Sequence, residues 1–331
     1  MKLVWIMAFS LCFAGSAYGK KVKLKIATMI PHVKTEEGKE DKSLSEPYLI
    51  FAKDVAKATD GRVKFNFTWG GVAGDENTVL RKIQSQQLAG AILTAQALSL
   101  EQPDVRVLEV PFTFKSSEQA SKTLHELRGK FEEGFKAKNY RTLGMYNFGE
   151  IYFVTKKETP NFDALKGQQI WLLNGDKLAA AFIKNMDLVG KTLDLPSVIS
   201  AFSSNMIDGA YAPAAAIVAL QWHNRVSYLI KPPFGYHFQG FLLSDSAWKK
   251  INEKDQAIIM KLAKELEEKI SATSQSLAQE ALAAITASGV KVIEWPESDI
   301  KKFQEVRNKV LNDLTGKELS KEITAQVNQQ L

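Results

Sequence analysis

The feature that most constrains the fold is one long amphipathic segment, residues Asn252 to Ala287. Apolar residues recur along it at helical spacing: Ile259, Leu262, Leu266, Ile270, Leu277, Ala281 and Ile285. This spacing places the apolar side chains on one face of an α-helix. At 1.5 Å per residue, a helix of about 35 residues is about 50 Å long. That length exceeds one ordinary lobe, so we expect the helix to pack behind two lobes.

The rest of the chain alternates between strand-like and helix-like patterns. Strands are expected at 22–30, 63–68, 90–94, 107–110, 141–147, 152–155, 169–173, 191–193, 207–211, 235–243 and 291–294. Helices are expected at 48–59, 75–85, 117–139, 176–186 and 196–205, and again after residue 294. Strands that alternate with helices are typical of a largely parallel sheet covered by helices.

The N-terminus has the pattern of an export signal. Lys2 is followed by an apolar run at 3–14 and by small residues that end at Gly19. The run is shorter than the ~20 residues that a membrane-spanning helix needs. Cys12 follows Leu11, which is too large for a lipoprotein site, so we expect cleavage near Gly19 and a soluble periplasmic protein without cysteine.

The sequence carries no catalytic or metal-binding signature. It has no Gly-x-Ser-x-Gly motif, and its four histidines do not have metal-ligand spacing. The glycine-rich segment 70–74 lacks the Lys and Ser/Thr of a phosphate loop, and Asp75 and Glu76 are interpreted as helix-capping acids. The net charge of +6 comes from scattered lysines. We therefore expect no cofactor, no metal and no nucleic-acid partner.

Several segments, taken in order, resemble the solute-binding proteins of TRAP transporters over residues 22–315. These are 48–114, the sequence KGQQIW at 166–171, the sequence FSSNMIDGAYAP at 202–213, and 221–256. The resemblance implies a two-lobed, periplasmic-binding-protein-like α/β fold. Each lobe would be a mixed, mostly parallel sheet flanked by helices, with the long helix backing both lobes.

The resemblance also implies a division of the chain and a function. We expect a signal peptide at 1–19, lobe 1 at 20–147 with 235–250 returning to it, lobe 2 at 148–234, and the bridging and C-terminal helices at 251–331. The protein would close its lobes around a small molecule and deliver it to TRAP membrane permease subunits. Two other classes stay open, a secreted hydrolase or lyase and an adhesion or scaffold protein with a vestigial cleft.

The departures from the family pattern concern the ligand. Trp171 and Ile151 stand where the family commonly has arginines that bind the ligand carboxylate, and Ala212 replaces an Asn. An ionised carboxylate that is buried without a cationic partner is costly, whereas apolar burial gains about 25 cal/mol per Å². We therefore expect an apolar or neutral ligand. The alternative is an organic acid held by a relocated cation, Arg81 or Arg225.

The pattern around Trp171 also resembles a divergent branch of the family with a tetratricopeptide-repeat lipoprotein partner and hydrophobic ligands. The candidate ligand-binding residues are Trp69, Thr94, Phe148, Ile151, Trp171, Tyr211, Trp222 and Tyr236. For the aromatic residues among them, the alternative is packing inside a lobe or between lobes. His237 is interpreted as a hydrogen-bonded hinge residue.

Overall fold

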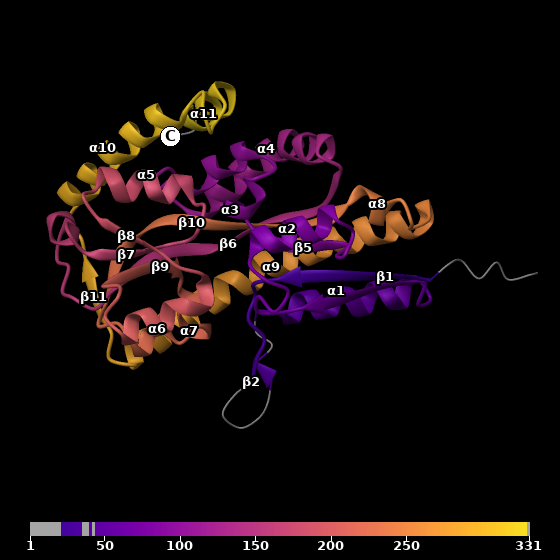
Figure 1. The fold of residues 1–331 in the computed structure, drawn as a ribbon, viewed down its shortest axis with the longest axis horizontal. Helices are drawn as coiled ribbons and strands as arrows, with labels where there is room; N and C mark the ends of the chain where they lie inside the picture. Colours follow the sequence, from indigo (N-terminus) through magenta and orange to yellow (C-terminus); the bar gives the residue numbers. More distant parts are fainter. Residues whose placement is uncertain (1–20, 35–39, 42–43, 330–331) are drawn as a thin grey trace, which may run out of the picture.

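The long helix expected from the apolar stripe is present as α9 (Glu253–Ala287), and it runs behind both ends of the molecule (Figure 1). Its first half contributes Ile270 to a hydrophobic core that contains Phe241. Its last turns contribute Ile285 to a different core that contains Trp222. One helix therefore supports two separate cores, as the length of its stripe predicts.

The computed structural model describes residues 21–34, 40–41 and 44–329. The predicted export signal and Cys12 lie outside these residues. In the described part, no helix is both long and apolar enough to cross a bilayer.

Nine strands of the described part form one mixed sheet. They are β1 (Val22–Thr28), β4 (Val63–Thr68), β5 (Gly90–Thr94), β6 (Tyr140–Thr155), β7 (Gln169–Leu172), β8 (Val189–Thr192), β9 (Gly209–Pro213), β10 (Tyr228–Ser244) and β11 (Lys291–Glu294). The order is β4-β1-β5-β10-β6-β9-β7-β8, and β11 pairs with β10. We call the part with β4, β1 and β5 the β5 end, and the part with β9, β7 and β8 the β7 end. A short pair, β2 (Val33–Lys34) and β3 (Glu40–Asp41), stands apart from this sheet.

The two ends are joined by the long strands β6 and β10. These two strands pair antiparallel from Tyr228 with Thr155 to Ser244 with Tyr140. Within this sheet, the pairs inside the β5 end and inside the β7 end are parallel, and every antiparallel pair includes β6 or β10. The expected mixed sheet is confirmed, but the sheets of the two lobes are continuous instead of separate. The proposed lobe boundaries stay predictions.

Helices cover both faces of this sheet. The α-helices besides α9 are α1 (Glu46–Ala58), α2 (Glu76–Gln84), α3 (Ala95–Leu98), α4 (Ser117–Ala137), α5 (Lys177–Asn185), α6 (Val198–Ser203), α7 (Ala214–Ala219), α8 (Asp245–Trp248), α10 (Glu297–Leu314) and α11 (Lys321–Asn328). The 3-10 helices are η1 (Pro103–Glu109), η2 (Phe162–Leu165), η3 (Leu195–Ser197) and η4 (Trp222–Asn224). In Figure 1, α1, α6 and α7 lie on the side of α9, while α3, α4 and α5 lie on the other side.

Three expected strands differ from the structure. Residues 107–109 belong to η1 instead of a strand, and Val110 is its C-cap, because a short buried apolar run fits a helix as well as a strand and Pro103 starts a helical turn here. The strands expected at 141–147 and 152–155 are one strand, β6, which continues through Gly149.

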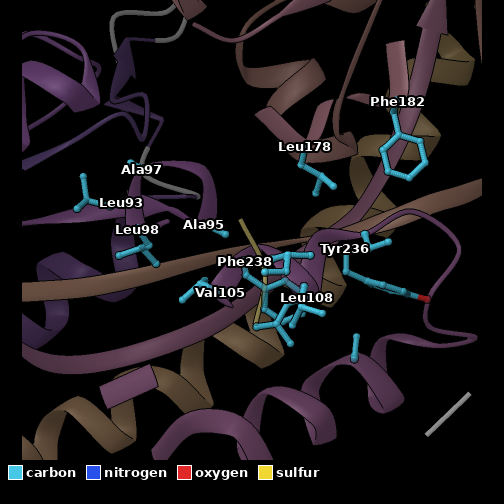
Figure 2. Packing of buried hydrophobic residues seen from close by; sticks show 14 of the residues in the cluster. Leu93, Ala95, Ala97, Leu98, Val105, Leu108, Leu178, Phe182, Tyr236 and Phe238 are labelled. Carbon is cyan, nitrogen blue, oxygen red and sulfur yellow. The ribbon is translucent and has the colours of Figure 1, made fainter. Parts of the chain in front are cut away.

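A third hydrophobic cluster extends from one end of the molecule to the other. Figure 2 shows Val105, Leu108 and Phe238 close together, and it shows Leu178 and Phe182 of α5 from the β7 end. All five belong to the same buried cluster. This cluster holds η1 against β10, and η1 carries the charged residues Arg106 and Glu109.

Candidate ligand-binding cleft

A cleft lies between the β5 end and the β7 end, with a cavity of about 350 Å³. This volume is within the range of small-molecule sites. The principal lining residues come from three parts of the fold. The β5 end and its following helices supply Glu76, Thr94, Gln96, Arg106 and Glu109; the β7 end supplies Trp171, Asp176, Tyr211 and Trp222; and β6 and β10 supply Phe148, Ile151, Phe153, Phe234, His237 and Gln239.

One side of the cleft is an aromatic wall, which we define as Phe153, Trp171, Tyr211, Trp222 and Phe234. The Trp171 ring packs against the rings of Tyr211 and Trp222, each at a centroid distance of 5.5 Å. Phe153 stacks on Phe234 at 4.5 Å. Trp171 is further fixed because its Nε1–H donates to the Leu193 carbonyl oxygen at 2.9 Å. The rings of the wall therefore contact one another directly, in addition to lining the cleft.

A second part of the lining is a charged wall, which we define as Glu76, Thr94, Arg106, Glu109, His237 and Gln239. Arg106 Nη1 donates to Glu109, and Arg106 Nη2 donates to Asp176 Oδ1 at 2.6 Å. Asp176 is the N-cap of α5, so this ion pair joins η1 at the β5 end to the β7 end across the cleft. The Gln96 side chain makes a second contact across the cleft, to the Asn174 carbonyl oxygen at 3.4 Å.

Glu109 is buried at the centre of the charged wall. Its Oε1 lies 3.0 Å from His237 Nδ1 and accepts a hydrogen bond from the Phe238 backbone N–H at 2.8 Å. Burial by itself raises the pKa of Glu109, but Arg106 and His237 outweigh it and hold the pKa below its ordinary value. The prediction that His237 is hydrogen-bonded agrees with this geometry.

The two acids at the start of α2 have different roles. Asp75 caps the helix as predicted, since its Oδ1 accepts the Thr78 N–H at 2.7 Å. Glu76 does not cap it. Its side chain turns inward and accepts the backbone N–H of Thr94 at 2.7 Å and the Thr94 hydroxyl at 2.6 Å. The capping interpretation of Glu76 was wrong because the first turn of a helix can present an acid to solvent or to the interior.

Six of the eight predicted ligand-binding residues line the cavity: Thr94, Phe148, Ile151, Trp171, Tyr211 and Trp222. Trp69 lies outside the lining and stacks on Phe67 and His32. Tyr236 also lies outside it, buried beside Phe114. We do not include these two residues in the site, because both are held by packing elsewhere.

The relocated cation is neither of the two arginines that the sequence suggested. Arg81 and Arg225 are exposed, and neither lines the cavity. Arg106 does, and among the described lining residues it is the single Lys or Arg. Sequence reasoning missed it because residue 106 lies outside every expected element, the nearest being the strand expected at 107–110, so the helical turn that carries Arg106 was not predicted. In η1, Arg106 and Glu109 are three positions apart and lie on the same side.

The described residues contain no group of His, Cys, Asp or Glu side chains that could hold a metal ion. The lining residues of the cleft offer hydrogen bonding, charge pairing and apolar contact. These interactions suit the reversible binding of a small organic molecule.

Comparisons with known proteins agree with this geometry. The sequence model of the family described as bacterial extracellular solute-binding protein, family 7, matches residues 36–318. A curated relative named "Solute-binding protein", from Chromohalobacter salexigens, is 24% identical over 254 residues, which is 74% of this chain and 73% of the relative.

Two solved structures show the same fold. A TRAP periplasmic solute-binding protein from Desulfovibrio salexigens, with bound orotic acid, matches with a TM-score of 0.84 at 17% identity. The sugar acid binding protein from Advenella mimigardefordensis, in complex with galactonate, matches with a TM-score of 0.85 at 18% identity. Each match covers 94% of this chain and 98% of the other. The predicted resemblance is confirmed at the level of the family: the chain belongs to family 7 of the bacterial extracellular solute-binding proteins.

Proposed function

We propose that the cleft binds an organic acid, with its carboxylate at Arg106 and its carbon skeleton against the aromatic wall, and that the protein delivers this acid to TRAP permease subunits. The observation that carries the proposal is the position of Arg106 in the cavity lining. A guanidinium group has five N–H donors. Two of them donate to Glu109 and Asp176, which leaves three for a ligand.

Tyr211 supplies a second donor on the aromatic wall. Burial raises its pKa well above the ordinary value, so the hydroxyl keeps its proton at neutral pH. No acceptor in the described part of the chain takes a hydrogen bond from this hydroxyl. A ligand carboxylate between Arg106 and Tyr211 would accept hydrogen bonds from both side chains. These charge-assisted hydrogen bonds would connect the β5 end to the β7 end.

This proposal replaces the apolar or neutral ligand that the sequence predicted. That prediction rested on Trp171 and Ile151 in place of two family arginines, and Arg106 now offers a cation from another element. Orotic acid and galactonate in the two similar structures also favour an acid. Cleavage near Gly19 and the tetratricopeptide-repeat lipoprotein partner stay predictions.

The experiment compares acids with their uncharged amides. Orotate, galactonate and 3-phenylpropanoate, each beside its amide, are tested by thermal shift and calorimetry. We expect at least one acid to raise Tm and its amide to have little effect. Arg106→Lys should weaken that acid at least tenfold, because Lys lacks the planar fork of donors. The matched control is Arg81→Lys at an exposed arginine outside the cleft. Amides that bind as tightly as the acids would exclude the proposal.

A further inference from the structure

The cleft contains a buried carboxylate without a counter-ion. Glu76 is 8% exposed, lines the cavity and accepts two hydrogen bonds from Thr94. Burial raises its pKa, and His237 is the basic group that acts on it electrostatically. His237 Nδ1, however, lies 3.0 Å from Glu109. In the described part of the chain, no Lys, Arg or His forms an ion pair with Glu76, although an ionised carboxylate in the interior is costly when it is unpaired.

A second buried polar group, the side chain of Gln239, has an oxygen without a hydrogen-bond donor in the described structure. Gln239 lines the cavity, is 8% exposed, and its Oε1 makes no hydrogen bond within the described structure. Gln239 of β10 pairs in register with Thr94 of β5, the residue that holds Glu76. Buried polar atoms are nearly always hydrogen-bonded. Thr94 therefore connects two acceptors: the Glu76 carboxylate, which has hydrogen-bond donors but no ion-pair partner, and the Gln239 amide oxygen, which has no donor in the described structure.

The charges of the lining residues also favour a positively charged group on the ligand. Its described lining contains five carboxylates, those of Asp75, Glu76, Glu109, Asp176 and Asp194, against one arginine and one histidine. Arg106 is already shared by Glu109 and Asp176. A second negative charge on the ligand would be repelled, and a positive charge would be attracted.

From these observations we infer that the ligand is amphoteric: besides its carboxylate it carries an ammonium group, which pairs with Glu76 and donates a hydrogen bond to Gln239. The inference rests on the proposed function for the carboxylate end and adds the second recognition element. The ligand class is then an amino acid or another amino-substituted organic acid with an apolar skeleton. Dicarboxylic acids are rejected by the charged wall.

The experiment uses sets of compounds that share one carbon skeleton. Each set contains a monocarboxylic acid, its 2-amino and ω-amino derivatives, the parent amine and the dicarboxylic acid, on propyl, isobutyl and phenylpropyl skeletons. Thermal shift on the full-length purified protein selects binders, and calorimetry gives Kd. We expect an amino acid to bind at least tenfold more tightly than its plain acid, and the dicarboxylic acid to bind more weakly than both.

The variant Glu76→Gln keeps the shape of the side chain and removes its charge. It should weaken the amino acid at least tenfold and should not weaken the plain acid, which has no ammonium group to pair with Glu76. The matched control is Glu46→Gln, since Glu46 is likewise the first residue of a helix but is exposed and outside the cavity lining. If Glu76→Gln weakens both compounds equally, the ammonium site is excluded.

The outcomes separate this inference from the proposed function. Binding of plain acids or dicarboxylic acids with equal or higher affinity than amino acids overturns the inference and leaves the acid receptor intact. If parent amines bind and no carboxylic acid binds, the proposed function is wrong and only the ammonium site at Glu76 is supported. No binding in any set overturns both.

Discussion

The two walls of the cleft are built in opposite ways. The aromatic wall stabilises itself, because its rings contact one another and Trp171 is hydrogen-bonded to the backbone. The charged wall is not complete by itself, since Glu76 has no described counter-ion and Gln239 Oε1 has no described partner. The comparison indicates that the aromatic wall gives shape and apolar contact, while the charged wall selects the ligand. Substitutions in each wall should therefore affect stability and binding differently.

The largest expected effect is loss of the cation at the centre of the charged wall. Arg106→Met leaves Glu109 and Asp176 without their shared partner, and breaking a buried ion pair costs about 3–5 kcal/mol. Urea unfolding should show this loss. The triple variant with Glu109→Gln and Asp176→Asn should recover most of the stability, because it removes the unpaired charges as well. A loss below about 1 kcal/mol in the single variant would mean that the pair contributes little to the fold.

A smaller loss is expected in the aromatic wall. Trp171→Phe keeps an aromatic ring but removes the Nε1–H that donates to Leu193. The unpaired carbonyl and the reduced volume should cost about 2 kcal/mol in unfolding free energy. Because the wall mainly provides shape, the preference for amino acids over plain acids should be unchanged. A changed preference would show that both walls select the ligand.

The aromatic wall was more predictable from sequence than the charged wall. Trp171 and Tyr211 lie on strands that the sequence pattern predicts, and both residues line the cleft. The same regularity made the long helix and most strands predictable. These features depend on periodicity, which is a local property of the sequence.

The charged wall could not be predicted because it depends on which way a side chain turns. Glu46 and Glu76 both begin a helix, yet the first is exposed and the second is buried against Thr94. The sequence near each contains the same signal, an acid in the first helical turn. Only the tertiary contact with β5 distinguishes them. Arg106 was missed for a related reason, since its partner Asp176 is 70 positions away in the chain.

Glu76→Gln should stabilise the ligand-free protein, in contrast to the two substitutions above. Burial raises the pKa of Glu76, so the ionised form is disfavoured in the folded state. At neutral pH, removal of the charge should add about 1 kcal/mol to the unfolding free energy, the usual scale for relief of a strained functional group.

The stability difference between this variant and the natural protein has a defined pH dependence. The difference in unfolding free energy has its full size above the folded-state pKa of Glu76. It decreases as the pH falls through that value, and it is absent below the unfolded-state pKa. Urea unfolding between pH 4 and 8 measures it. A variant that is less stable than the natural protein at pH 7 would show that the Glu76 charge is already compensated.

The smallest effect on stability is expected at Tyr211, the residue of the aromatic wall that we propose binds the ligand carboxylate together with Arg106. Tyr211→Phe keeps the ring contacts with Trp171 and Phe153 and removes only a hydroxyl that has no acceptor in the described structure. Unfolding free energy should therefore change by less than about 0.5 kcal/mol. Acid affinity should fall about tenfold, which is about 1.4 kcal/mol, because the carboxylate loses one hydrogen bond while Arg106 remains. The amides, which bind weakly, should be unaffected. If the variant binds acids normally, the ligand carboxylate contacts Arg106 and not Tyr211. The aromatic wall would then contribute apolar contact but no hydrogen bond to the carboxylate.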